Sequence, residues 1–158
     1  RGPALMTRYL PADLPPPFTS DGWLTTRDRG DLDARGRLTI FGRDDDVIVT
    51  GGEKVDPLAI ERAVEGCPGV RRAFVFGVPD ATWGALVAVA VIGDREDADL
   101  PRRLAEHCAR TLPPAGRPRR LALVDDLPET ADGKPARREA ALMWSSRLVP
   151  LFGGHPGV

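Results

Sequence analysis

The sequence predicts an α+β fold, in which a small mixed β-sheet is flanked by helices and preceded by a short β-meander. Apolar residues recur at helical spacing in two segments, 57–67 and 100–112. Two runs rich in Val, Ala and Phe, 71–80 and 86–93, are typical of strands. Because helices and strands alternate imperfectly, the pattern indicates a mixed sheet. A chain of 158 residues is about one domain long.

The first part of the chain is expected to be irregular and then β-rich. Residues 11–22 are rich in Pro and turn-forming residues, which indicates a surface connection. Three short strand candidates follow at 23–26, 30–34 and 37–42, and 34–36 supplies the turn between the last two. A meander of this size would be marginally stable alone.

The pattern changes at residues 44–46, three consecutive Asp that favour a linker. A strand is predicted at 47–50, the next two glycines form a tight turn, and the chain returns at 53–55. Asp56 followed by Pro57 predicts the start of a helix, because Asp caps free N–H groups and Pro fits the first helical position.

The remaining elements follow the same periodicities. The first helix has one apolar stripe: Ile60, Ala63, Val64 and Cys67. A second helix should begin near Leu100, a fourth strand should cover 121–124, and Pro135 should open a final helix.

Composition excludes several classes of function. The formal net charge of −1 removes the argument for a general binder of nucleic acids or acidic membranes. The longest uncharged apolar run, 84–93, is about half of what a bilayer span requires. Cys67 and Cys108 occupy positions that suit a small apolar residue, so buried, reduced thiols in a cytoplasmic protein are expected. A disulfide or a nucleophilic thiol remains an alternative, and no His/Cys cluster indicates zinc.

Four motifs occur in order: DGWLTTRD, GRLTIFGRDDDVIVTGGEKVDPLAIE, GVPDATWGALVAVAVI and LPETADGKPARRE. Each resembles a motif in the C-terminal part of the adenylate-forming ligases, which include acyl- and aryl-CoA synthetases, nonribosomal adenylation domains and luciferases. The likeness covers residues 2–140, nearly the whole chain. The GGEKVDP variant and the Arg-rich composition also resemble, more distantly, the actinobacterial aryl-acid ligases such as o-succinylbenzoate–CoA ligase.

The resemblance implies a division of the chain. Residues 1–43 would be the end of a large N-terminal domain, whose other parts hold the phosphate-binding loop and the acid pocket. Residues 44–46 would be a hinge, and 47–145 the small mobile C-terminal domain. No prediction is made for the tail, 146–158. The chain is therefore expected to be a fragment that is inactive alone.

Lys134 is the expected catalytic residue. Of the 22 Lys and Arg residues only Lys54 and Lys134 are Lys, and Lys134 occupies the Gly-Lys position of the family. Adenylate formation brings a carboxylate against the α-phosphate of ATP, and a compact ammonium can contact both anions. The alternative is an exposed lysine that only aids solubility. Lys54 replaces the commoner Asn and receives no catalytic role.

Three further residues match the nucleotide site and the hinge. Asp28 corresponds to the family aspartate that accepts hydrogen bonds from the ribose hydroxyls, and Arg43 to an arginine at the ribose. Asp45 corresponds to the pivot of the hinge. A turn carboxylate, a surface ion pair and a plain acidic linker are the alternatives. Arg27 replaces a family glycine, which is expected to strain the loop and weaken nucleotide binding if that position has a positive φ.

The remaining expected site residues concern CoA. Gly51, Gly52, Glu53 and Pro57 match the loop that lines the pantetheine tunnel, where a backbone without Cβ atoms can lie against a slender thiol arm. An ordinary hairpin turn would explain the glycines equally well.

Trp83 and the basic stretch 115–120, with Arg117 and Arg119, resemble the places that receive the CoA nucleotide. An indole stacks on adenine, and guanidinium groups suit phosphates. A packing Trp and a solvated basic loop are the alternatives.

Taken together, the resemblance implies an ATP-dependent carboxylic acid–CoA ligase that forms an acyl-adenylate and then a thioester. It implies ATP, Mg²⁺ and CoA, with the metal ligand on the absent part, and a cytoplasmic enzyme with no membrane span. One alternative is an adenylation domain that loads a carrier protein. Another is a non-catalytic accessory domain that only docks.

Overall fold

The computed structural model describes residues 2–8, 17–127 and 137–152. The chain divides into two compact units, Arg1–Asp45 and Asp46–Val158. Lys134 and Pro135 lie outside the described residues.

The first unit contains one antiparallel hairpin, formed by β1 (Asp28–Leu32) and β2 (Leu38–Arg43). The turn between them is held by the Asp33 carboxylate, which accepts hydrogen bonds from the backbone N–H groups of Arg35 and Arg37, both at 2.9 Å. The hydrogen bonds from the backbone N–H and the guanidinium of Arg37 are the main causes that lower the pKa of Asp33.

The prediction of a strand at 23–26 was wrong, so the expected three-stranded meander is a two-stranded hairpin. Leu24 makes only an isolated bridge to Phe18. Trp23 N–H donates to the hydroxyl of Thr19 at 3.0 Å, and Thr19 N–H donates to the carbonyl of Trp23 at 2.8 Å. These local bonds satisfy the backbone within a turn, where a Ser or Thr side chain competes with sheet formation.

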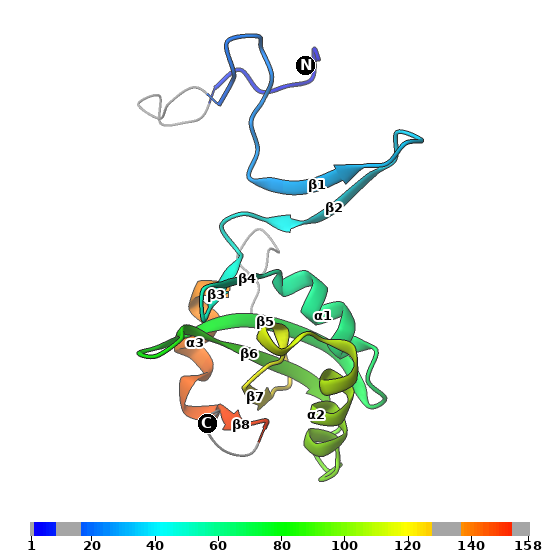
Figure 1. Ribbon diagram of the computed structural model, residues 1–158, viewed down its shortest axis with the longest axis vertical. Coiled ribbons are helices and arrows are strands. Elements are labelled where there is room, and N and C mark those ends of the chain that lie inside the picture. Colours follow the sequence, from blue (N-terminus) through cyan, green and yellow to red (C-terminus); the bar gives the residue numbers. More distant parts are fainter. Residues whose placement is uncertain (1, 9–16, 128–136, 153–158) are drawn as a thin grey trace. The chain divides into compact units, whose positions relative to one another are not determined.

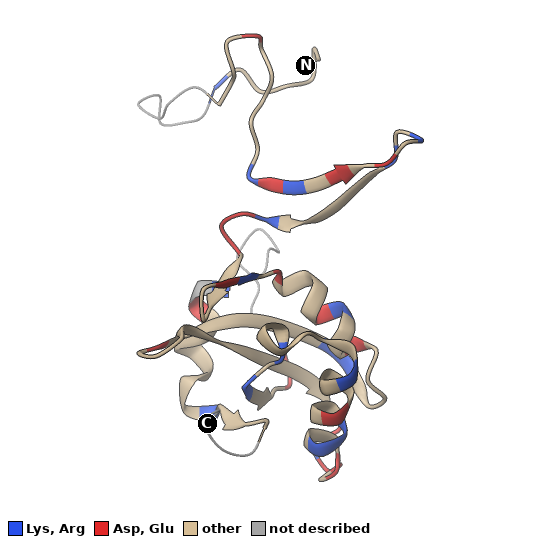
Figure 2. Cartoon of the chain, viewed as in Figure 1, with Lys and Arg blue, Asp and Glu red and all other residues tan. Residues whose placement is uncertain are grey.

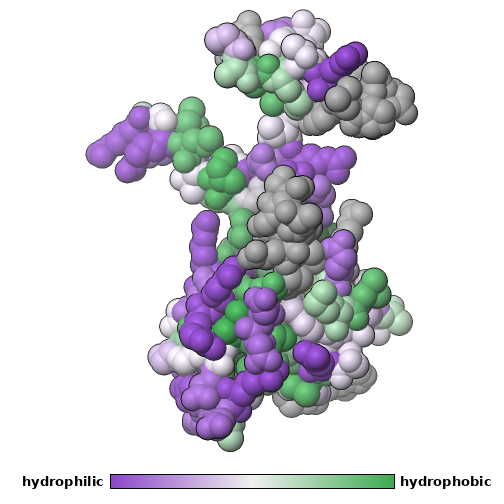
Figure 3. Space-filling view, turned by 180° about the vertical axis from the view of Figure 1, so that it is seen from behind, coloured by the Kyte–Doolittle hydropathy of each residue, from purple (hydrophilic) through white to green (hydrophobic). Residues whose placement is uncertain are grey.

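The hairpin exposes apolar side chains on one face. Leu32 pairs with Leu38, and Ile40 lies two residues further along the same strand. Their exposed fractions are 63%, 63% and 47%. Figure 3 shows hydrophobic surface on this hairpin next to hydrophilic residues, and Figure 2 shows that charged residues flank it at the turn and in β1.

The second unit is built on a four-stranded mixed sheet (Figure 1). In order across the sheet its strands are β5 (Val70–Asp80), β6 (Gly84–Gly93), β7 (Arg120–Leu123) and β8 (Val149–Pro150). The pairs β5–β6 and β7–β8 are antiparallel, and β6–β7 is parallel. The predicted α+β class with a mixed sheet is therefore confirmed.

Helices cover both faces of this sheet. They are α1 (Pro57–Glu65), α2 (Leu100–Thr111) and α3 (Arg137–Trp144), with short 3-10 turns at Pro114–Gly116 and Ser145–Arg147. Side chains from α1 and α2 share one apolar core with Val75 and Val89 of the sheet. Ala140 and Trp144 of α3 share the other core with Phe74 and Phe76. The alternation along β5 follows from the two-residue period of a strand.

The helix start predicted at Asp56 and Pro57 is confirmed. The Asp56 carboxylate accepts a hydrogen bond from Leu58 N–H at 3.0 Å, and Pro57 occupies the first turn. The helix ends at Glu65, so Cys67 lies just beyond it rather than on its last turn. Both Cys67 and Cys108 are unpaired and buried, as expected.

The final helix, expected over 135–148, ends earlier, because α3 ends at Trp144 and a 3-10 turn follows. Strand β8 was not predicted, and the residue after it, Leu151, belongs to the core shared with α1 and α2. Within the described ranges, no helix is long and apolar enough to cross a membrane.

Candidate functional site

A tight turn joins β3 (Ile48–Thr50) to β4 (Glu53–Val55). Its two central residues, Gly51 and Gly52, have φ of +57° and +83°. Positive φ at both positions is what a two-residue hairpin turn of the favoured hand requires, and glycine adopts it without a Cβ clash. The predicted hairpin is therefore present at the expected residues.

This turn supports the indole of Trp83, which lies in the turn between β5 and β6. Gly51 N–H donates to the carbonyl of Trp83 at 2.9 Å. A Cβ on Gly51 would lie 2.6 Å from Cε3 of Trp83, whereas a Cβ on Gly52 would meet nothing within 4 Å. The indole is held against the backbone of Gly51 and remains 38% exposed.

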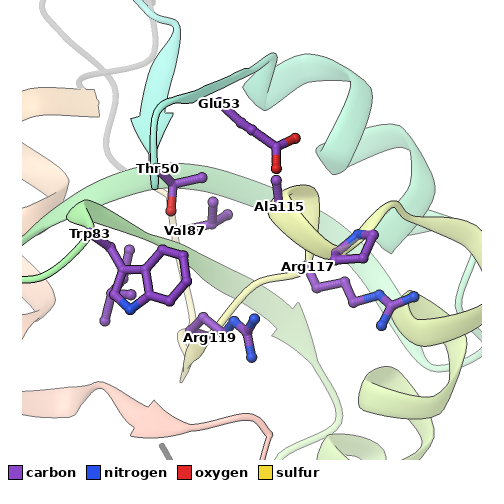
Figure 4. A pocket seen from close by; sticks show the side chains of 9 residues that line it. Thr50, Glu53, Trp83, Val87, Ala115, Arg117 and Arg119 are labelled. Carbon is purple, nitrogen blue, oxygen red and sulfur yellow. The ribbon is translucent and has the colours of Figure 1, made fainter. Parts of the chain in front are cut away.

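A pocket of about 200 Å³ opens beside this indole (Figure 4). Three segments line it: the β3–β4 hairpin, the start of β6 with Trp83, and the segment 114–119. The structure thereby brings together four of the residues expected to bind CoA, Glu53, Trp83, Arg117 and Arg119. Glu53 and Arg119 lie at opposite sides of the pocket in Figure 4.

The two arginines of the pocket differ in what their guanidinium groups contact. Arg117 donates to the carbonyls of Leu112 and Ala109, at 3.1 Å and 3.0 Å, at the C-terminal end of α2. A cation at that position satisfies free carbonyls and the negative end of the helix dipole. Arg119 is half-buried, and its guanidinium has no partner among the described residues. Arg119 is therefore the arginine with free donors.

The other three residues expected to bind CoA do not line the pocket. Gly51 supports the indole, Gly52 is exposed, and Pro57 is fully buried at the start of α1. Pro57 therefore contributes to helix initiation and packing.

Sequence reasoning missed several residues of the pocket wall: Thr50, Leu86, Val87, Pro114 and Ala115. Their types carry no chemical signal, and only their adjacency to the glycine turn and to the basic stretch could have indicated them.

The expected nucleotide and hinge residues form an ion-pair cluster in the first unit. Arg43 Nε lies 3.0 Å from Asp45 Oδ1, and its Nη1 lies 3.4 Å from Asp28 Oδ1. Arg27 Nη1 lies 3.5 Å from Asp45 Oδ2. The hydrogen bond from Arg43 is the main cause that lowers the pKa of Asp45, and the charge of Arg27 adds to it. All these side chains are substantially exposed, so each pair contributes little stability.

A metal centre is not indicated by the part of the chain that the structure describes. It contains no group of three or more His, Cys, Asp or Glu side chains that could hold a metal ion.

Comparison with known proteins shows what the chain is similar to. Residues 59–134 match the family model described as the AMP-binding enzyme C-terminal domain. The chain is 36% identical over 137 residues to a 2-succinylbenzoate–CoA ligase of Enterococcus faecalis, covering 87% of this chain and 28% of that protein. It is 37% identical over 139 residues to the fatty acid–[acyl-carrier-protein] ligase ScoC of Streptomyces coeruleorubidus, covering 87% and 27%.

Comparison with solved structures leads to the same family of ligases. The o-succinylbenzoate CoA synthetase of Bacillus subtilis, in complex with its acyl-adenylate intermediate, matches with a TM-score of 0.70 and 30% identity. That match covers 78% of this chain and 25% of the synthetase chain. The chain spans about a quarter to two fifths of the length of the curated relatives that it matches. The resemblance drawn from the motifs is thus confirmed: the chain belongs to the adenylate-forming ligases, and it carries their C-terminal domain.

Proposed function

We propose that this chain is the C-terminal part of an ATP-dependent carboxylic acid–CoA ligase. Residues 1–43 would complete the large domain, 44–46 would be the hinge, and 47–145 would be the mobile domain. The observation that carries the proposal is the pocket in which the Gly51–Gly52 turn supports Trp83 next to the guanidinium of Arg119, which contacts no partner in the described part of the chain.

The chemistry of this pocket suits CoA. The indole offers an exposed aromatic face on which adenine can stack. The free fork of Arg119 can donate to a phosphate, and charge-assisted hydrogen bonds of this kind are about twice as strong as neutral ones. The glycine turn leaves the backbone accessible to a narrow thiol arm. Arg117 would act by ending α2 at the correct place rather than by direct contact.

The first half-reaction is assigned to other residues. Lys134 would neutralise charge between the acid and the α-phosphate of ATP, and Asp28 and Arg43 would bind the ribose. Because Arg43 contacts both Asp28 and Asp45, nucleotide binding and the hinge would share one guanidinium. Magnesium would accompany ATP, and the family resemblance implies that its protein ligand lies in the large domain.

Two acceptors are consistent with the relatives, which include ligases for CoA and for acyl-carrier proteins. The pocket favours free CoA, because an aromatic face and a free guanidinium provide contacts for its nucleotide. A carrier-bound pantetheine has no nucleotide and would leave these groups unused. For the acid, the relatives favour 2-succinylbenzoate. The two buried, unpaired thiols fit a cytoplasmic enzyme.

The test uses the complete ligase and measures the two half-reactions separately. Lys134→Ala is expected to abolish adenylate formation and to leave thioester formation from a preformed adenylate largely intact. Lys54→Ala, which changes the other lysine of the chain, is the matched control and should affect neither step. Equal loss of both half-reactions in Lys134→Ala would contradict the assignment. The isolated chain should have no ligase activity.

A further inference from the structure

A buried ion cluster joins four separate segments of the second unit. Arg137, at the start of α3, places Nη1 2.5 Å from Oε1 of Glu61 in α1 and 2.6 Å from the carbonyl of Val75 in β5. Its Nη2 donates to the second oxygen of Glu61 at 3.3 Å. Its Nε lies 3.4 Å from Oδ2 of Asp46. The guanidinium carbon also lies 4.8 Å from the ring centroid of Phe74.

Burial and hydrogen bonds fix the Arg137–Glu61 pair of this cluster. The side chains of Arg137 and Glu61 are only 8% and 11% exposed, and a buried charge is costly unless it is paired and hydrogen-bonded. Glu61 is further fixed because it accepts a hydrogen bond from Val75 N–H at 2.8 Å. The planar fork of arginine defines one orientation of the α3 start relative to α1 and β5.

The Asp46 contact is the weaker part of the cluster. Arg137 Nε is buried and makes no hydrogen bond within the described residues, although Asp46 is close enough for an ion pair. Asp46 is 37% exposed, so it can move without exposing the Glu61 pair. The cluster therefore has a fixed side at Glu61 and an adjustable side at Asp46.

Two residues of the cluster lie close in sequence to residues of the proposed mechanism. Asp46 directly follows the proposed hinge residue Asp45, and Arg137 follows Lys134 by three residues. Three residues of extended chain span at most about 11 Å. One guanidinium thus connects Asp46, the last residue of the proposed hinge segment, to the start of α3, three residues after Lys134 in the sequence.

We propose that Arg137 is a positioning residue for Lys134, which it holds in place through the buried pair with Glu61, and that its contact with Asp46 couples this position to the hinge. The inference rests on the proposed function of Lys134. Arg137 itself has no contact with substrate in this account. Its loss should affect the step that uses the lysine and spare the step that does not.

The test compares variants of the complete ligase in the two half-reactions. Arg137→Lys keeps the charge but loses the fork, so the maximal rate of adenylate formation should fall by about tenfold or more while KM for ATP stays within about twofold. Thioester formation from a preformed adenylate should stay within about twofold. Asp46→Asn leaves the Glu61 pair intact and should cause a smaller loss in the same direction.

A matched control is Arg103→Lys. Arg103 also joins separate segments, through Asp97 at 2.6 Å and the carbonyl of Pro68 at 3.3 Å, but it is distant in sequence from both the hinge and Lys134. It should leave both half-reactions unchanged. Circular dichroism and thermal unfolding check that each variant is folded, and Asp46→Asn serves if Arg137→Lys is not.

A double variant distinguishes an effect that acts through Lys134 from a general loss of structure. If Arg137 acts through Lys134, Arg137→Lys should cause no further loss of the residual adenylation in a Lys134→Ala background. An additive loss, or an equal loss in both half-reactions, would overturn the positioning role. An unaffected Arg137→Lys enzyme beside an inactive Lys134→Ala enzyme would overturn this inference alone. An active Lys134→Ala enzyme would instead overturn the proposed function.

Discussion

The backbone of Gly51 supports the indole of Trp83: the N–H of Gly51 donates to the Trp83 carbonyl at 2.9 Å, and no Cβ separates the turn from the ring. Gly51→Ala would bring a methyl group within 2.6 Å of Cε3 of the indole. We expect the ring to be displaced from the pocket, with weaker CoA binding and a shift in Trp fluorescence. Calorimetric titration of the complete ligase with CoA measures the effect.

Gly52→Ala is the control for this prediction. It introduces the same unfavourable positive φ, which costs about 1–2 kcal/mol in either variant, but its methyl group meets nothing within 4 Å. The two variants should therefore lose similar stability from strain, and only Gly51→Ala should lose affinity for CoA. Equal affinities in the two would show that the indole does not contact the ligand.

Substitutions of the two arginines of the pocket should have different effects, one on CoA binding and the other on stability. Arg119→Gln removes a free guanidinium, and the loss of one charge-assisted hydrogen bond should weaken CoA binding by roughly tenfold or more. Arg117→Gln removes the bonds to the carbonyls of Ala109 and Leu112 and should lower the free energy of unfolding by about 1 kcal/mol instead. Titration with CoA and denaturant unfolding distinguish them, and the reverse pattern would refute the assignment.

The thiols should be inert in the folded protein. Burial is the main cause that raises the pKa of Cys67, and it raises the pKa of Cys108 to about 11. Iodoacetamide at pH 8 should therefore label neither thiol in native protein and both in denaturant, because only the thiolate reacts. Rapid labelling of the native protein would contradict the burial.

The same shift predicts a dependence of stability on pH. A thiol whose folded pKa is raised favours the folded state below its unfolded pKa, about 8.5, and this contribution is lost as pH rises toward 11. Cys108→Ala should remove part of the decline in unfolding free energy between pH 8 and pH 11. An unchanged slope in the variant would show that another group causes the decline.

The capping residue of α1 should matter more than its counterpart at α2. Asp56→Ala removes the acceptor for Leu58 N–H and should cost about 1 kcal/mol of unfolding free energy. Asp99, at the start of α2, makes no side-chain capping bond and only exposed ion pairs with arginines. Asp99→Ala should therefore cost less, as denaturant unfolding of both variants will show.

Local features of the fold were predictable because they depend on neighbouring residues. The Asp56–Pro57 helix start and the turn at Gly51 and Gly52 are set by capping and by backbone sterics. The prediction of a strand at 23–26 was wrong for a related reason: hydrogen bonds with Thr19 hold Trp23 in a turn that composition does not reveal. Strand β8 was missed because a strand of two residues is too short to show the alternation of polar and apolar side chains.

The family and four of the nine residues that line the pocket could be predicted from the sequence alone, because the motifs keep their residue types and spacing. Only the tertiary structure decided that Arg117 binds the end of α2 while Arg119 has no partner among the residues that the structure describes, since two arginines separated by one residue have the same chemistry in a sequence. It also decided that Glu61, Arg137 and Asp46 meet. Contacts between residues far apart in the chain depend on how helices pack on the sheet, and no local pattern encodes that packing.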